Sequence, residues 1–380
     1  MSRSRRAPGD GSIYQRADGR WEASISMGWG PGGKRRRRKV VAKTRAGAKA
    51  RLADLQKALD DGLSLDASKM TLTRWLTVWL DDHVKLSVRP RTFATYRQIT
   101  IQHLIPSLGH RKLRDLSASD VQRYLNEKAK NLSPKTVSHH HAVLRRALRR
   151  AEEFGFVGRN VARLVTPPKQ VRHQVSPLSA AEARQFLDAL EGHRLRPLYV
   201  LGMASGMRRA ELLGVTWEAV HLEAGTVRVE RSLMRYDREH HLDEVKTLAS
   251  RRTLALPAPV VAALRAQRAR QAAERLASEV WLNDWDLVFT DRVGRPLEGT
   301  YVTAEFQRIL EAAGVRRVRL HDLRHGVATF MLACGVPLKA IQTYLGHSTY
   351  QITADTYAHM LPQMERDAAE RVGTLLFGAV

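Results

Sequence analysis

The chain has 380 residues, 43% of them hydrophobic and 27% charged, which is too long for one ordinary core and predicts two or three domains. Lysine and arginine outnumber aspartate and glutamate by 63 to 38, for a formal charge of +25. Such an excess favours nucleic acid as partner, with a ribosomal or merely solvated basic surface as the alternative. A single cysteine excludes an intramolecular disulfide and a zinc ribbon.

That cysteine, Cys334, lies among Phe330, Met331 and Leu332, so we expect it to be a small buried hydrophobic residue. No apolar segment follows the basic N-terminus, and no apolar run is long enough for a membrane span. These features predict a soluble protein of a reducing compartment, with no membrane partner.

Residues 1–65 predict a small domain in which a three-stranded sheet packs on one helix. Two stretches before residue 28 alternate between apolar and polar residues with period two, and turn signals separate them from a third. A helix beginning near Thr44 carries alanine and leucine on one stripe.

The same domain holds much of the charge. Residues 1–60 contain 16 Lys+Arg and 5 Asp+Glu, so +11 of the +25 falls here. Six of these cations form the continuous run Lys34, Arg35, Arg36, Arg37, Arg38 and Lys39. A solvated tail and a nuclear localisation signal are two interpretations of such a run. Its place at the flank of a hairpin, beside Tyr14 and Trp21, favours a DNA-contacting sheet.

Residues 66–168 predict an all-helical domain. The expected helices span residues 73–84, 91–105, 121–130 and 134–154. Pro106 and Gly109 are expected to end the second of them, and a variant capping box at Ser117 precedes the third. The solvent-exposed face of the last helix carries Arg145 and Arg149, which either bind a DNA duplex or are simply solvated. Three consecutive histidines point in different directions, so we expect no metal site there.

Residues 169–380 predict a mixed, mainly helical domain with a small sheet. A charged linker with prolines at both ends, over residues 167–177, marks the boundary. A capping box at Ser179 opens the first helix. Two helical segments then follow over residues 197–214 and are broken at Gly206.

The sheet of this last domain is expected from two extended stretches. Val227 and Val229 alternate with polar residues, and residues 253–256 form the second stretch. Turn-forming residues over 236–250 predict an irregular link between them. From residue 301 onward helices dominate.

Several residues of this domain are candidates for chemistry, although each alone has an ordinary structural explanation. Arg208 and Glu211 are spaced to share a helix face, where a carboxylate can hold a guanidinium, but a surface salt bridge is the default for such a pair. His321 and Arg324 have the same spacing and could be a capped helix start. Three further candidates, which alone could be a loop lysine, a packing histidine and a core tyrosine, are Lys246, His347 and Tyr357.

Taken together and in order, these residues resemble the signature of the tyrosine recombinase (phage integrase) family. The matching motifs are GMRRAELLG at 206–214, LHDLRH at 320–325, LGHS at 345–348 and TYAH at 356–359. Tyr357 follows His347 by ten residues (357 − 347 = 10), where phage-type members place the nucleophile. Gly326, where many relatives carry serine or threonine, departs from the pattern outside the catalytic positions.

The resemblance extends over the whole chain and implies three domains. They are an arm-type DNA-binding domain over 1–65, a SAM-like core-binding domain over 66–168 and a catalytic domain over 169–380. The catalytic residues that it implies are Arg208, Lys246, His321, Arg324, His347 and Tyr357, with Glu211 in support. Covalent 3′-phosphotyrosyl chemistry on double-stranded DNA is the expected activity.

The chemistry of these side chains agrees with that activity. Two planar guanidiniums suit the nonbridging oxygens of a phosphodiester, and His347 would add a third donor. His321 suits proton transfer at the Tyr357 phenol, and Lys246 is the candidate acid for the departing 5′ oxygen. The sequence has neither a Walker loop nor a carboxylate cluster, so we expect no ATP, metal or other cofactor.

Three alternatives compete with a recombinase. A type IB topoisomerase can use the same constellation, a non-catalytic DNA-binding regulator can share the fold, and an RNA-binding role would fit the charge. The basic N-terminal domain favours a recombinase that touches DNA at two places. By resemblance we expect a homotetramer in the bacterial cytoplasm on the nucleoid, with a possible DNA-bending host factor and directionality factor. The apolar tail ending at Phe377 packs either on a neighbouring protomer or in its own core.

Overall fold

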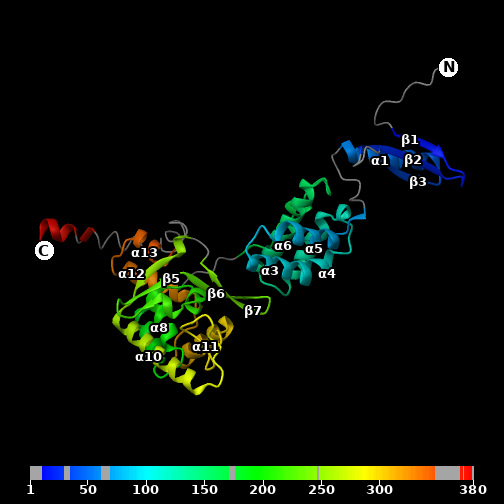
Figure 1. The fold of residues 1–380 in the computed structure, drawn as a ribbon. Coiled ribbons are helices and arrows are strands. Elements are labelled where there is room, and N and C mark those ends of the chain that lie inside the picture. Colours follow the sequence, from blue (N-terminus) through cyan, green and yellow to red (C-terminus); the bar gives the residue numbers. More distant parts are fainter. Residues whose placement is uncertain are drawn as a thin grey trace. The chain divides into compact units, whose positions relative to one another are not determined.

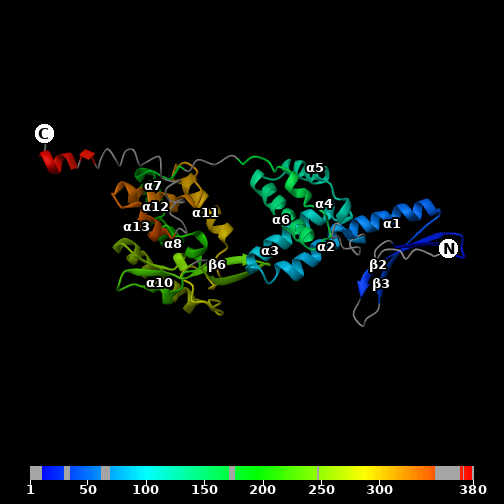
Figure 2. The same ribbon diagram turned by 90° about the horizontal axis from the view of Figure 1, so that it is seen from above.

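The computed structural model describes residues 11–29, 35–60, 69–170, 176–245, 248–346, 369–370 and 372–378. The chain divides into two compact units, Met1–Arg172 and His173–Val380, and each is described by itself (Figures 1 and 2). The division falls inside the linker predicted over residues 167–177. Within the described segments, no helix is long and apolar enough to cross a membrane.

The first unit begins with an antiparallel sheet of three strands in the order β1-β2-β3. The elements are β1 (Ser12–Gln15), β2 (Trp21–Trp29), β3 (Arg35–Ala42) and the helix α1 (Arg45–Asp60). Ala23 and Ile25 of β2 pack with Ala48 and Leu52 of α1 in a core of their own. The predicted sheet on one helix is therefore confirmed.

The basic run forms most of β3. Lys39 pairs across the sheet with Ser24, and Arg37 with Ser26. Neighbouring residues on β2 alternate between the two faces, so these two cations lie on the face opposite the Ile25 core. Lys39 Nζ lies 2.9 Å from a carboxylate oxygen of Glu22 on the same face.

The rest of the first unit is helical, as predicted, with a second separate core. Its elements are α2 (Leu72–Val78), η2 (Trp79–Val84), α3 (Pro90–Ile99), η3 (Thr100–Leu104), α4 (Ile105–Leu108), η4 (Leu113–Asp115), α5 (Ala118–Ala129), α6 (Pro134–Glu153) and η5 (Val161–Leu164). The indole of Trp75 is fully buried and donates to the carbonyl of Ala147 at 3.0 Å, which joins α2 to α6. Ser117 and Asp120 form the predicted capping box of α5.

Pro106 does not end the second helix, so that part of the prediction was wrong, whereas Gly109 caps its end as predicted. The helix widens into a π turn at η3 and continues as α4 to Leu108. Proline lacks an N–H group and is tolerated in the first turn of a helix. Pro106 lies in the first turn of α4, where the π-helical bonding has just ended, so its missing donor is accommodated at the junction.

A buried histidine makes this helical core sensitive to acid. His140 of α6 is 1% exposed, and the Tyr124 hydroxyl lies 2.9 Å from its Nδ1. Burial, followed by the nearby His103 and Lys128, lowers the pKa of His140 to about 4. The unfolded chain, with a histidine pKa near 6.5, therefore binds more protons than the folded chain between about pH 6.5 and pH 4, and stability falls as pH falls through this window.

We expect the helical domain to lose about 1–2 kcal/mol of stability between pH 7 and pH 5. Hydrogen exchange of the α5 and α6 amides in the whole chain, corrected for intrinsic exchange rates, measures this loss. His140→Gln should reduce the pH dependence, whereas His139→Gln, at the exposed neighbour, should retain it. Equal pH dependence in wild type and His140→Gln would contradict this assignment.

The second unit is mainly helical and holds two small antiparallel sheets, β4-β5-β8 and β6-β7. Its helices are α7 (Ala180–Asp188), α8 (Arg196–Ser205), α9 (Arg209–Leu213), η6 (Trp217–Ala219), η7 (Leu248–Ser250), α10 (Ala258–Ala277), α11 (Gly299–Ala312), α12 (Asp322–Ala333) and α13 (Leu338–Leu345). Its strands are β4 (Val220–His221), β5 (Thr226–Val229), β6 (Arg231–Tyr236), β7 (Glu239–Glu244) and β8 (Arg252–Ala255). Helix α8 packs against both α10 and α12 (Figure 1). The capping box at Ser179 and the break at Gly206 are confirmed.

The hairpin β6–β7 was not predicted, because residues 236–250 read as an irregular link. Asp237 and Arg238 both have positive φ, at 52° and 71°, and connect the strands in a two-residue turn. Turns of this kind usually contain glycine or asparagine, and arginine there gives no sequence signal. Adjacent histidines in β7 further obscure the alternation of a strand.

Cys334 is exposed, so its predicted burial was wrong. It is the C-terminal cap of α12, two residues after Leu332, which is 1% exposed. Two residues correspond to roughly 200° around a helix, so Cys334 turns away from the face on which Ala328 and Leu332 are buried.

Candidate active site

Arg208 stands where the chain leaves α8 and enters α9. Gly206 caps α8 with a left-handed φ of +61°, and Arg208 is then the N-cap of α9. The backbone N–H of Arg208 donates to Glu211 Oε2 at 3.0 Å, and its Nη1 donates to Glu211 Oε1 at 2.5 Å. The expected contact between this carboxylate and guanidinium is therefore present.

Glu211 is a buried carboxylate held between two arginines. It is 3% exposed and also accepts a hydrogen bond from Arg252 Nη2 at 3.0 Å. Burial opposes its ionisation, but the charges of Arg252 and Arg208 prevail and lower the pKa of Glu211 below its ordinary value. The carboxylate stays charged and fixes the orientation of Arg208.

Arg324 comes from α12 and is 3% exposed. Its Nη1 donates to the carbonyl of Gly206 at 2.8 Å, and its Nη2 donates to the carbonyl of Leu345 at 2.5 Å. One guanidinium therefore joins the turn before Arg208 to the end of α13.

Arg208 reaches the same end of α13. Its Nη2 donates to the carbonyl of Gly346 at 3.2 Å, next to the Leu345 carbonyl that Arg324 holds. Gly346 caps α13 with a left-handed φ of +67°. Two arginines from distant segments thus converge on consecutive carbonyls, those of the two residues that precede His347 in the sequence.

Three predicted catalytic residues lie outside the described residues, namely Lys246, His347 and Tyr357. The described chain ends at Gly346 on one side of this gap and resumes only at residue 369. Of the predicted catalytic set, the structure therefore brings Arg208 and Arg324 together with the supporting Glu211, and places His321 at the start of α12.

His321 differs from Arg324 in its surroundings, although the two were expected on one helix face. It precedes the first residue of α12 and is exposed, whereas Arg324 is buried. Its ring lies edge-on to that of His325, with centroids 5.4 Å apart. Protein still surrounds enough of the ring that desolvation, followed by the charges of His325 and Arg324, lowers the pKa of His321 to about 4. At neutral pH the imidazole is therefore uncharged and able to accept a proton.

Arg252 is a residue of this cluster that the sequence analysis missed. Besides Glu211, it donates to the carbonyls of Tyr344 at 2.7 Å and Ser250 at 3.0 Å, and its side chain is 6% exposed. Arg252 lies two positions before the buried Leu254 in β8, so strand periodicity places both on one face. The two-residue spacing from Leu254 was the sequence signal that could have predicted a buried Arg252.

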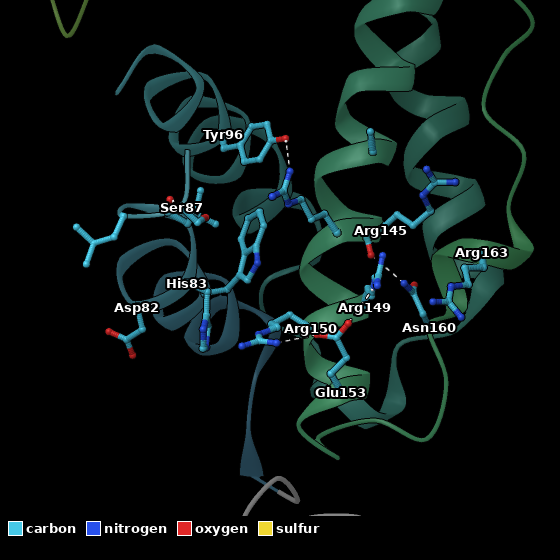
Figure 3. Close-up of a pocket in the computed structure, with 15 residues that line it drawn as sticks. Asp82, His83, Ser87, Tyr96, Arg145, Arg149, Arg150, Glu153, Asn160 and Arg163 are labelled. Atoms are coloured by element: carbon cyan, nitrogen blue, oxygen red, sulfur yellow. Dashed lines mark hydrogen bonds and ion pairs between the residues drawn. The ribbon is translucent and has the colours of Figure 1, made fainter. Parts of the chain in front are cut away.

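The predicted DNA contacts fall in the two parts of the first unit. Lys34 and the side chain of Arg35 lie outside the described residues, Arg36, Arg37 and Lys39 are exposed, and Arg38 is half-buried. Arg145 and Arg149 line a groove of about 1000 Å³ between α6, η2 and α3, together with Arg146, Arg150 and Arg163 (Figure 3). Glu153 accepts from Arg149 Nε at 3.0 Å and from Arg150 Nη1 at 2.8 Å in the same groove.

Among the described residues, no group of three or more His, Cys, Asp or Glu side chains could hold a metal ion.

The mainly helical fold with its small antiparallel sheets is that of the tyrosine recombinase class. The chain belongs to the phage integrase family. The family model described as "Phage integrase family" matches residues 177–364, and one described as "Phage integrase, N-terminal SAM-like domain" matches residues 71–129.

Full-length relatives agree with this membership. The chain is 34% identical to an integrase of Streptomyces ambofaciens, over 93% of both chains. It is 29% identical to a tyrosine recombinase XerC-like protein of Caldanaerobacter subterraneus, over 93% of this chain and 96% of the relative. Its fold is similar to that of a lambda integrase tetramer bound to a Holliday junction, with a TM-score of 0.58, 18% identity and coverage of 93% and 96%.

Proposed function

We propose that the protein is a site-specific DNA recombinase that cuts and rejoins strands through a covalent 3′-phosphotyrosyl intermediate and so integrates or excises a mobile element. The observation that carries the proposal is the convergence of Arg208 and Arg324 on the carbonyls of Gly346 and Leu345. This arrangement gathers two permanent positive charges at the residues that directly precede His347 in the sequence, where they can bind a phosphate. The presence of both arginines also argues against a non-catalytic regulator of the same fold.

The arginines act on the phosphate. The transition state of attack spreads negative charge over the nonbridging oxygens, and fixed guanidiniums stabilise that charge without reorganising. Glu211 keeps Arg208 in place, and His347 contributes a further donor. Since the charge is already supplied by these side chains, the reaction needs no metal.

Proton transfers complete the reaction. The Tyr357 oxygen attacks phosphorus and gives its proton to His321, which is uncharged at neutral pH. The bond to the 5′ oxygen breaks as that oxygen takes a proton from Lys246. The phosphotyrosyl ester conserves the energy of the phosphodiester bond that breaks, so a free 5′-hydroxyl can reverse the step without ATP.

Lys246 can be tested through its leaving group. We expect Lys246→Ala to slow cleavage of ordinary DNA by roughly 10²–10⁴-fold, the usual contribution of a general acid. A substrate with sulfur at the scissile 5′ position should restore most of the rate, because a thiolate departs without needing a proton. Single-turnover cleavage of both substrates measures this, and Tyr357→Phe, which should stay inactive on each, is the control. Equal slowing on both substrates would remove Lys246 from this role.

The domains share the work of holding DNA. We assign residues 1–65 to arm-type DNA binding, 66–168 to core-site binding and 169–380 to catalysis, which the separate hydrophobic cores of these segments support. The exposed cations of β3 and the arginine groove of α6 suit phosphate backbones. Attachment sites in double-stranded DNA are the substrate, and a homotetramer performs strand exchange on the nucleoid of a bacterial host cell. A bending host factor and a directionality factor are possible further partners.

A nicked suicide substrate bearing candidate attachment-site DNA tests the function. Cleavage releases the short fragment between the scissile phosphate and the nick, which carries the free 5′-hydroxyl and diffuses away. Religation is then impossible, so the wild-type protein should accumulate as a covalent adduct with the 3′ end of the remaining strand. Recombination between paired sites, without relaxation of supercoiled plasmid lacking them, separates a recombinase from a type IB topoisomerase. Site-independent relaxation without recombination would support the topoisomerase instead.

A further inference from the structure

Arg252 touches the three segments that carry or adjoin Arg208, His347 and Lys246. We propose that Arg252 is a positioning residue of the recombination site. It keeps the Glu211 carboxylate from offsetting the whole charge of Arg208, and it fixes the end of α13. This inference rests on the proposed function and extends it to a residue that does not itself meet the phosphate.

The contacts of Arg252 define the first part of the role. Its Nε holds the carbonyl of Tyr344 in the last turn of α13, at 2.7 Å, and its Nη1 holds the carbonyl of Ser250, at 3.0 Å. Tyr344 is three residues before His347, and Ser250 is four residues after Lys246. One buried guanidinium therefore anchors the chain shortly before His347, at Tyr344, and shortly after Lys246, at Ser250.

Close packing makes this anchor rigid. A Cβ atom built on Gly346 would lie 3.2 Å from Arg252 Nη1 and 2.9 Å from the carbonyl oxygen of Ala249. The turn after α13 therefore lies directly against Arg252 and the link that follows β7. Any displacement of the Arg252 guanidinium is transmitted to this turn, whose carbonyls Arg208 and Arg324 hold.

Charge defines the second part of the role. Arg208, Arg252 and Glu211 form a cluster of two guanidiniums and one carboxylate, with a net charge of +1. With Arg252 present, the Glu211 charge is shared, and Arg208 retains positive charge for a phosphate. Without Arg252, the buried carboxylate would pair with Arg208 alone, and the net charge of that pair would be zero.

The test compares Arg252→Gln with Arg251→Gln in the full-length protein. Arg251 is the matched control, because it is the adjacent arginine but pairs at the surface with Glu244, at 2.7 Å. We expect Arg252→Gln to slow single-turnover cleavage of the suicide substrate at saturating protein by about a hundredfold, the cost of roughly a 1 Å displacement of catalytic groups. The Kd for that DNA should stay near the wild-type value, and Arg251→Gln should cleave like wild type.

A double variant separates charge from structure. Glu211→Gln/Arg252→Gln should cleave faster than Arg252→Gln, because the carboxylate that would neutralise Arg208 is gone. Arg252→Lys, which keeps the buried charge, should fall between Arg252→Gln and wild type and provides the comparison if the glutamine variant does not fold. Arg252→Gln cleaving like Arg251→Gln, or a double variant no faster than Arg252→Gln, would overturn the proposal. An adduct with wild type but not with Tyr357→Phe shows that the proposed function stands even where this inference fails.

Discussion

Replacing Arg324 by lysine should slow DNA cleavage by about 10²–10³-fold, although the charge is conserved. Lysine has no planar fork, so it cannot hold the carbonyls of Gly206 and Leu345 at once while facing a phosphate. Because Arg324 is 3% exposed, the shorter ammonium would also be poorly solvated there. Single-turnover cleavage at saturating protein measures the loss.

Arg319→Lys is the matched control for this substitution. Arg319 lies five residues upstream, and its half-exposed side chain pairs with Asp322 at 2.8 Å. The control should cleave at close to the wild-type rate. If Arg324→Lys were equally active, the assignment of Arg324 to the phosphate would be untenable.

Replacing Gly346 by alanine should lower the free energy of unfolding of the catalytic domain by about 2–5 kcal/mol and severely reduce cleavage. A left-handed backbone costs a residue with a Cβ atom about 1–2 kcal/mol, and overpacking adds about 1–3 kcal/mol. Both costs apply, since φ is +67° and the added Cβ would meet the backbone oxygen of Ala249 at 2.9 Å. Cleavage falls because the Gly346 carbonyl accepts from Arg208.

Gly192→Ala isolates the backbone cost. Gly192 has φ of +72°, and nothing lies within 4 Å of an added Cβ atom. Urea unfolding should show a loss of only about 1–2 kcal/mol for this variant, with cleavage unchanged. Equal destabilisation of the two variants would mean that the contact between Gly346 and Ala249 is not tight.

Local sequence rules predicted much of this fold because they act over a few residues. Ser117 and Ser179 are followed three residues later by Asp120 and Glu182, and both capping boxes form. Gly206 breaks a helical pattern and adopts the left-handed conformation that favours glycine. The contact of Arg208 with Glu211 also follows from spacing alone.

Features that depend on distant contacts could not be predicted in this way. The partners of Arg252 lie 41 and 92 residues away in the chain, at Glu211 and Tyr344. The same holds for Arg324, whose carbonyl partner Gly206 is 118 residues distant. The helix also continues through Pro106, a local stop signal, by way of the π turn η3, whose Leu104 is buried in the helical core.

The most direct test of the account is to identify the residue that becomes linked to DNA. Protein trapped on the suicide substrate would be digested, and the peptide that retains a nucleotide would be sequenced by mass spectrometry. We predict a 3′-phosphonucleotide on Tyr357, no adduct with Tyr357→Phe, and an unchanged adduct with the control Tyr350→Phe. A nucleotide on any other residue, or an adduct that persists in Tyr357→Phe, would contradict the account.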